Sequence, residues 1–227
     1  MTARQFKDSI YEQLARIGRA LSAPRRLELI DLLCEGPRTV DALATLSSLS
    51  IANASQHLRA LHRARLVETA KKGLFVEYRV ADENVRKYLH VTRELAESRL
   101  TEIREITANF LKARDALEPI SGEELVRRVR SDEVTLIDVR PSEEYQAGHI
   151  PGALSVPLAD LGAFIATLPK KREIVAYCRG RYCVMAVDAA LRLREAGYRA
   201  HRMEYGVMDW RARGWRLERT PARSARS

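Results

Sequence analysis

The sequence has little cysteine, few aromatic residues and no long hydrophobic run. Its 227 residues include 3 cysteines, an odd number that makes no disulfide framework and indicates a reducing, cytoplasmic location. No apolar stretch approaches the roughly 18 residues that a membrane span requires. The first residues also lack the hydrophobic segment of a signal peptide. We therefore expect a soluble cytoplasmic protein with no membrane partner.

Positive charge is what the chain has in excess. The formal net charge is +9, and both parts are positive when the chain is divided at Glu118. A polyanionic partner such as nucleic acid suits this balance, although the balance alone does not identify one. Local clustering of charge has to make that case.

The first half of the chain predicts helices followed by a hairpin. Apolar residues repeat at helical spacing over residues 8–21 and 24–34, after Thr39, and again from Ser50, which caps a helix ending near Ala64. Two alternating runs follow, joined by the cationic turn 71–73. A helical pattern then continues from 82 to about 117, a length typical of packing against a partner helix. This order predicts a mainly α winged helix-turn-helix.

A candidate DNA-binding face lies within this half. No acidic residue occurs from 42 to 67, whereas arginines do. Short polar side chains can reach base edges and arginines bind phosphates. The alternative is a polar solvent-facing surface on an ordinary helical bundle. The candidate DNA-binding residues are Ser50, Asn53, Ser55, Gln56, His57, Arg59, Arg63, Lys71 and Lys72.

The run Arg19-Ala-Leu-Ser-Ala-Pro-Arg-Arg-Leu27, residues 50–61 and the hairpin together resemble the arsenical-resistance repressor (ArsR) family over roughly 10–115. The resemblance implies a homodimer built on the first and last helices. It also implies an inverted-repeat operator of double-stranded DNA, with repression as the family default. Metal-sensing members carry a cysteine pair where this chain has Arg-Thr-Val-Asp at 38–41, and Cys34 is the only thiol of this half. We therefore expect no metal site.

After a break at 118–122 the pattern alternates between helix and strand. Helices are expected over 123–130, 158–168 and 183–196 and around Asp209, and strands over 134–139, 173–177 and 199–203. Such alternation predicts an α/β domain with a mainly parallel sheet. The expected organisation is two domains, 1–118 and 119–220, and a disordered tail at 221–227.

The segment from 174 to 183 carries the clearest chemical signal. An apolar strand ends in Cys178, a tight cationic loop follows, and a helical pattern begins at Cys183. Backbone N–H groups and the positive end of a helix both favour a thiolate, which is the nucleophilic form. The alternative is a buried strand-end cysteine without reactivity. The two arginines that follow at once favour the reactive interpretation.

This segment, with Asp138-Val-Arg140, Gly148-His-Ile-Pro-Gly-Ala153 and Tyr205-Gly206, resembles the rhodanese (sulfurtransferase) domain over about 121–217. The resemblance implies that Cys178 takes a sulfane sulfur from a donor such as thiosulfate or a persulfide, without a cofactor. Phosphatase relatives end their loop in arginine at the seventh position, where this chain has Val184. The predicted catalytic loop comprises Cys178, Arg179, Gly180, Arg181, Tyr182 and Cys183.

Individual roles follow from this interpretation. Arg179 and Arg181 are expected to attract an anionic donor, while Asp138, Arg140 and His149 are expected to hold the loop and the strand ends. Cys183 could attack the persulfide, or it could be a small residue packed inward at a helix start. The sequence leaves open whether Cys183 or Cys34 participates.

Three functions fit these features. The first is a transcriptional regulator, by family default a repressor, whose DNA binding responds to a persulfide on Cys178. The second is a thiosulfate or persulfide sulfurtransferase whose activity is not coupled to DNA binding. The third, an inactive interaction module, leaves the cysteine at the start of the loop without a purpose.

Overall fold

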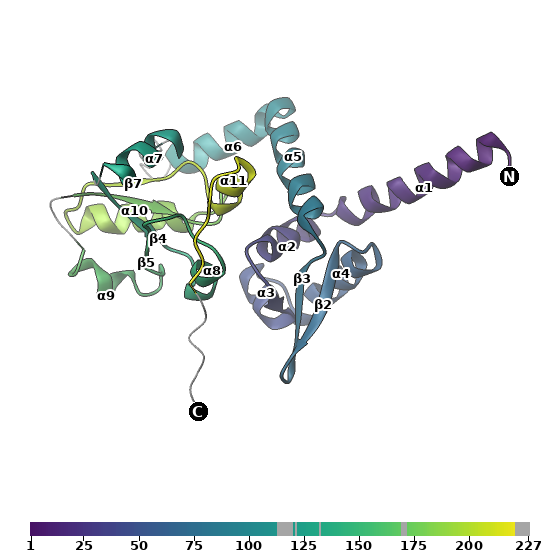
Figure 1. The fold of residues 1–227 in the computed structure, drawn as a ribbon, viewed down its shortest axis with the longest axis horizontal. Coiled ribbons are helices and arrows are strands. Elements are labelled where there is room, and N and C mark those ends of the chain that lie inside the picture. Colours follow the sequence, from purple (N-terminus) through teal and green to yellow (C-terminus); the bar gives the residue numbers. More distant parts are fainter. Residues whose placement is uncertain (113–119, 121, 132, 169–171, 221–227) are drawn as a thin grey trace. The chain divides into compact units, whose positions relative to one another are not determined.

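The computed structural model describes residues 1–112, 120, 122–131, 133–168 and 172–220 (Figure 1). Its contacts divide the chain into two compact units, Met1–Thr92 and Arg93–Ser227. The predicted boundary at 118/119 and the predicted tail at 221–227 both lie outside the described residues.

The first unit is a winged helix-turn-helix. Its elements are α1 (Ala3–Leu21), α2 (Pro24–Cys34), β1 (Arg38–Thr39), α3 (Val40–Leu46), α4 (Ile51–Arg63), β2 (Val67–Lys72), β3 (Phe75–Val80) and the start of α5 (Glu83–Arg99). The strands form an antiparallel sheet in the order β1-β3-β2. Ser50 caps α4 as expected, because its Oγ accepts a hydrogen bond from the Asn53 N–H at 3.3 Å. Leu29, Leu43 and Leu58 are fully buried between the helices.

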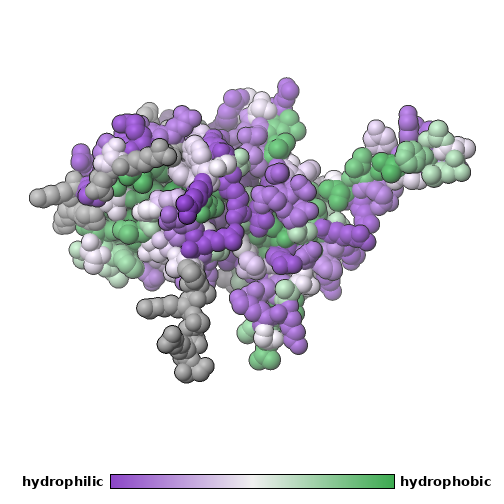
Figure 2. Space-filling model, in the orientation of Figure 1, coloured by the Kyte–Doolittle hydropathy of each residue, from purple (hydrophilic) through white to green (hydrophobic). Residues whose placement is uncertain are grey.

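Helix α1 extends away from the other elements of its unit, and Figure 2 shows hydrophobic side chains along it. Phe6, Ile10, Tyr11 and Leu14 are all exposed on this helix. A monomer would leave these apolar side chains in water, at a cost in free energy that increases with the exposed apolar area.

The long helix expected from 82 to about 117 is two helices. Helix α5 ends at Arg99, and α6 (Thr101–Lys112) begins after Leu100. The boundary between the compact units falls inside α5, so this one helix begins in the first unit and ends in the second.

The second unit is an α/β layer structure. Its remaining elements are α7 (Gly122–Arg130), β4 (Val134–Asp138), α8 (Ser142–Ala147), β5 (Leu154–Ser155), α9 (Leu161–Ile165), β6 (Glu173–Tyr177), α10 (Met185–Glu195), β7 (Ala200–Arg202) and α11 (Val207–Ala212). Its four strands pair in parallel in the order β5-β4-β6-β7, which agrees with the predicted parallel sheet.

Successive residues of a strand point to opposite sides of the sheet. In this unit the side chains on both sides are buried. Ile174 and Ala176 of β6 pack into a core with α10, whereas Val175 and Tyr177 pack on the other face with Trp210 of α11. Because β4 and β6 pair in parallel, their carboxyl ends lie at the same edge of the sheet. Among the described residues, no helix is long and apolar enough to cross a membrane.

Candidate functional site

Cys178 directly follows β6 and lies at the start of a tight loop. Its side chain is almost completely buried, at 3% exposed. The Cys183 N–H donates to the Gly180 carbonyl at 3.0 Å, which closes the loop as a turn. The Cys178 thiol lies 3.3 Å from the carbonyl oxygen of Cys183. The loop therefore curls around the sulfur and brings its two cysteines together.

The negative charge of this pair does not lie where the sequence suggested. Burial raises the pKa of Cys178 well above its ordinary value, and hydrogen bonds with the backbone of Ala186 and Gly180 only partly oppose this. A hydrogen bond from Cys178, helped by the backbone of Met185, lowers the pKa of Cys183 to about 6. The expected stabilisation of a thiolate by the loop thus falls on Cys183 in the resting protein, and Cys178 keeps its proton.

Both loop arginines form ion pairs with carboxylates. The guanidinium of Arg179 binds Glu144 of α8 through two nitrogens, at 2.6 and 3.0 Å, and Glu144 is 2% exposed. Arg181 lies 2.5 Å from a carboxylate oxygen of Glu97 in α5 and 3.9 Å from Glu204. These ion pairs fix the loop to two helices, and the attraction of an anionic donor by the same arginines stays a prediction.

Gly206 packs directly against the backbone of the loop that contains Cys178. A Cβ atom at this position would lie 2.1 Å from the backbone carbon of Arg179 and 2.3 Å from the Gly180 nitrogen. Such contact is impossible, so the loop backbone rests directly on this glycine. Asp209 at the start of α11 accepts a hydrogen bond from the Gly206 N–H at 3.0 Å and fixes the turn.

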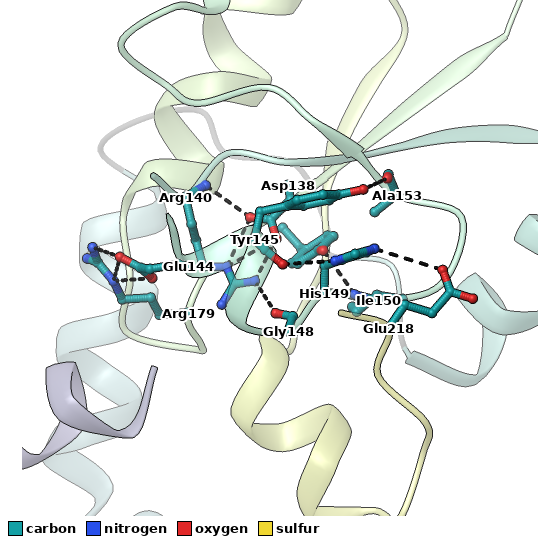
Figure 3. Close-up of polar contacts among 11 residues, drawn as sticks. Asp138, Arg140, Glu144, Tyr145, Gly148, His149, Ile150, Ala153, Arg179 and Glu218 are labelled. Atoms are coloured by element: carbon teal, nitrogen blue, oxygen red, sulfur yellow. Dashed lines mark hydrogen bonds and ion pairs between the residues drawn. The ribbon is translucent and has the colours of Figure 1, made fainter. Parts of the chain in front are cut away.

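Asp138 and Arg140 form a buried ion pair at the end of β4 (Figure 3). The Nη2 atom of Arg140 lies 2.6 Å from a carboxylate oxygen of Asp138 and 2.8 Å from the carbonyl of Gly148. Both side chains are at most 1% exposed. The pair therefore fastens the strand end to the segment after α8.

His149 also takes a supporting position. Its ring stacks on Tyr145 with centroids 3.7 Å apart, and its Nδ1 lies 2.8 Å from the Tyr145 carbonyl oxygen. Its backbone pairs with Glu218, whose carboxylate lies 3.8 Å from Nε2 (Figure 3). His149 thus ties the last described residues to α8.

A cavity of about 590 Å³ opens beside the loop, within the second unit. Its lining includes Glu97, Arg104, Arg181, Tyr182, Arg202 and Glu204. Within the described residues, the buried Nε of Arg202 has no hydrogen-bond partner. Burial lowers the pKa of Arg202, while charge on Glu204 and Cys178 opposes that change. Arg179 and Arg181 bind carboxylates, whereas Arg202 is a cation near Cys178 whose Nε could donate a hydrogen bond to a small anion.

Sequence reasoning missed Arg202, Glu97 and Glu144. For Arg202 a signal existed, because it ends the strand beside β6, pairing with Ala176 in register, and parallel strands end at one edge. The two glutamates lie far from residue 178 in the sequence, and no spacing pattern links them to the loop.

The candidate DNA-binding residues lie on α4 and on the hairpin. Asn53, Gln56, Arg59 and Arg63 are exposed, Ser55 and His57 are half-buried, and the opposite face of α4 is buried. Lys71 and Lys72 are exposed, but they end β2 rather than form the turn, which lies at 73–74. The Lys72 Nζ atom lies 3.1 Å from a carboxylate oxygen of Glu77. One continuous basic and polar helix face is therefore available to a partner.

The described part of the chain contains no group of three or more His, Cys, Asp or Glu side chains placed to bind a metal ion. Cys34 lies buried at the end of α2.

Two family descriptions match this sequence. Residues 23–69 match "Bacterial regulatory protein, arsR family", and residues 121–213 match "Rhodanese-like domain". Over 208 residues the chain is 43% identical to the HTH-type transcriptional regulator Rv0324 of Mycobacterium tuberculosis, covering 92% of this chain and 91% of that relative.

Other similar proteins match one half each. The putative sulfurtransferase YtwF of Bacillus subtilis is 33% identical over 95 residues, 41% of this chain and 90% of the relative. The solution structure of a homodimeric winged helix-turn-helix DNA-binding domain from Mycobacterium bovis, titled a possible ArsR-family regulator, is 36% identical with a TM-score of 0.41. It covers 44% of this chain and 91% of that chain.

Proposed function

We propose that this chain, which belongs to the ArsR-type HTH transcriptional regulators and carries a rhodanese domain, changes its affinity for operator DNA when Cys178 takes up reactive sulfur. The protein binds DNA as a homodimer and represses transcription in one of its two sulfur states. A persulfide on Cys178 is the signal.

One observation carries this proposal: the loop of Cys178 is bound to the helix that begins in the DNA-binding unit. Arg181 and the Tyr182 hydroxyl each lie 2.5 Å from a carboxylate oxygen of Glu97. The guanidinium of Arg93, one turn earlier in α5, lies 5.8 Å from the centre of the Tyr182 ring. A change in loop geometry therefore acts directly on the last turns of α5.

Persulfidation supplies such a change. It adds a sulfur atom inside a loop with little free space, and the anionic persulfide puts negative charge where the resting Cys178 carries a proton. That charge competes with Glu97 for Arg181. The two states differ in one contact, Arg181 with Glu97 or with the persulfide, and such a difference is what allosteric coupling requires.

The DNA-binding half supports the proposal through two surfaces. The exposed face of α4 offers Asn53 and Gln56 to base edges and Arg59 and Arg63 to phosphates. The exposed apolar side chains of α1 suit burial against a second copy of the chain. A symmetric dimer presents two α4 helices to an inverted repeat.

A sulfurtransferase that works independently of DNA binding is the second candidate. The cavity beside the loop and the unpartnered nitrogen of Arg202 favour it, because together they suit a small anionic donor. This candidate predicts turnover of thiosulfate and an operator affinity that does not depend on the sulfur state.

The deciding experiment measures operator affinity of the full-length dimer, reduced and after treatment with polysulfide. The operator is first selected in vitro from random duplexes. We expect treatment to change the affinity of the wild type by about 5- to 150-fold, the usual range of allosteric coupling. Cys178→Ser should not respond, whereas Cys34→Ser, which changes a cysteine of the other unit, should respond like the wild type. An unchanged wild-type affinity together with thiosulfate turnover would establish the second candidate instead.

A further inference from the structure

The loop that holds Cys178 contains a second thiol in contact with the first. The 180–183 turn brings the Cys183 carbonyl to 3.3 Å from the Cys178 sulfur, and the two side chains share a hydrogen bond. Cys178 is buried, and the half-buried Cys183 packs against the same core cluster. A sulfur atom added to Cys178 therefore enters a loop in which Cys183 is a direct neighbour.

The surroundings of Cys183 favour a nucleophilic sulfur. The hydrogen bond from Cys178 is the largest cause of its low pKa, followed among the favourable ones by hydrogen bonds with the backbone of Met185 and Arg179 and by the charge of Arg179. The backbone groups stay in place after Cys178 has reacted. Arg179 is fixed by Glu144, so its charge is also held near the loop.

We propose that Cys183 resolves the Cys178 persulfide: its sulfur attacks the inner sulfur of the persulfide, expels hydrosulfide and leaves a Cys178–Cys183 disulfide. This inference rests on the proposed function, because it requires that Cys178 be persulfidated. It gives the chain a further activity, the reduction of sulfane sulfur to sulfide.

The atoms and electrons of both steps balance. Cys178 first attacks the sulfane sulfur of thiosulfate, passes its proton to Cys183 and releases sulfite. Cys183–SH and Cys178–S–S⁻ then give the disulfide and HS⁻, so the proton leaves on the departing sulfur. The sulfane sulfur gains two electrons, and the two cysteine sulfurs lose one each. An external thiol reductant, itself oxidised to a disulfide, restores the loop.

Proximity favours this route over reaction with a thiol from solution. Well-placed neighbouring groups react as if at concentrations far above those of any dissolved thiol. The remaining cysteine, Cys34, belongs to the other compact unit and is buried at the end of α2. A disulfide needs the two sulfurs to close to about 2.0 Å, and the hydrogen bond that the two side chains share already brings them into contact.

The test follows both products in full-length reduced protein treated with thiosulfate and, separately, with an organic persulfide. Trypsin cuts after Arg179 and Arg181, so the disulfide appears as a cross-linked pair of peptides, 173–179 and 182–192. In the wild type we expect this pair and about one hydrosulfide released per loop. In Cys183→Ser we expect a persulfide on Cys178 that lasts at least about ten times longer, with no hydrosulfide.

Control variants and outcomes separate this inference from the proposed function. Cys34→Ser should behave like the wild type, and the melting temperature of Cys183→Ser should show that it is folded. A wild-type persulfide as long-lived as that of Cys183→Ser, or sulfur found first on Cys183, overturns the inference alone. Failure of both donors to load Cys178 in Cys183→Ser, together with no hydrosulfide release and no disulfide in the wild type, overturns the proposed function and this inference together.

Discussion

At the scale of single residues, the loop 178–183 places the buried strand-end position and the low pKa on two different cysteines. Cys178 holds the buried position at the end of the strand, and Cys183 holds the low pKa. Burial disfavours a charged sulfur, while hydrogen bonds and a nearby cation favour it. The half-buried Cys183, rather than the buried Cys178, is therefore the thiolate of the pair.

The charge on Cys183 can be measured by alkylation with iodoacetamide across pH. Because its pKa is about 6, Cys183 should react slowly below pH 6, faster as pH rises through 6, and at a constant rate above about 7. Cys178→Ala removes the hydrogen-bond donor and should shift the midpoint upward, toward the ordinary value of about 8.5. A midpoint near 8.5 in both proteins would contradict this assignment of charge. Peptide mass spectrometry identifies which cysteine is labelled.

Gly206 is the residue whose replacement should damage the loop most directly. Gly206→Ala forces a carbon into the space of the Arg179 backbone, which must move. Overpacking of this kind costs about 1–3 kcal/mol or more. We expect a lower melting temperature and little sulfur loading of Cys178. Gly162→Ala is the matched control, because nothing lies within 4 Å of its new carbon, and it should behave like the wild type.

At the scale of elements, sequence periodicity predicted most of what the structure contains. Helix α2 and the parallel strands β4, β6 and β7 follow from apolar spacing, since each buries a regular stripe or both of its faces. Short elements were missed: α8 was expected as a loop, and β5 has two residues, fewer than any periodic pattern needs. The break at Leu100 was missed because the apolar spacing continues across it.

The parts of the site that lie in contiguous segments could be predicted from the sequence. The contacts between residues far apart in the chain could not. The loop 178–183 and the supporting roles of Asp138 and Arg140 were predicted from contiguous segments. The ion pairs of Arg179 and Arg181 were not predicted, because the sequence shows a charge but not the carboxylate that binds it in the fold. Only the fold shows that Glu144 and Glu97 meet these two arginines.

The contact between the loop and α5 should transmit the sulfur signal. Glu97→Gln keeps an oxygen that can accept from Tyr182 but removes the charge that holds Arg181. We expect Cys178 to load with sulfur normally, while the sulfur-induced shift in operator affinity falls by at least about threefold. Glu102→Gln, an exposed glutamate in the first turn of α6, should leave the shift unchanged. An undiminished shift in Glu97→Gln would exclude this contact as the route.

At the scale of the whole molecule, two copies of the chain are needed before an inverted repeat can be read. Leu14 on α1 is 61% exposed, and a charge there opposes burial against a second copy. Leu14→Glu should therefore weaken the dimer at least about tenfold in sedimentation equilibrium, and operator binding should weaken with it. Glu12→Gln changes the charge by the same amount in the opposite direction, at an exposed position away from the apolar side chains, and should leave the dimer intact. A Leu14→Glu protein that dimerises normally would place the interface elsewhere.

The pairing of Ile120 with the far end of its unit also bears on how the chain is made. The Ile120 N–H donates to the Arg202 carbonyl, and the Glu204 N–H donates back to Ile120. Ile120 therefore has no partner for this bridge until a segment more than eighty residues further along the chain has left the ribosome. The first unit, Met1–Thr92, leaves the ribosome before all of these residues and can fold before that moment. Every newly made chain can thus complete its winged helix-turn-helix unit while its rhodanese domain is still unfinished.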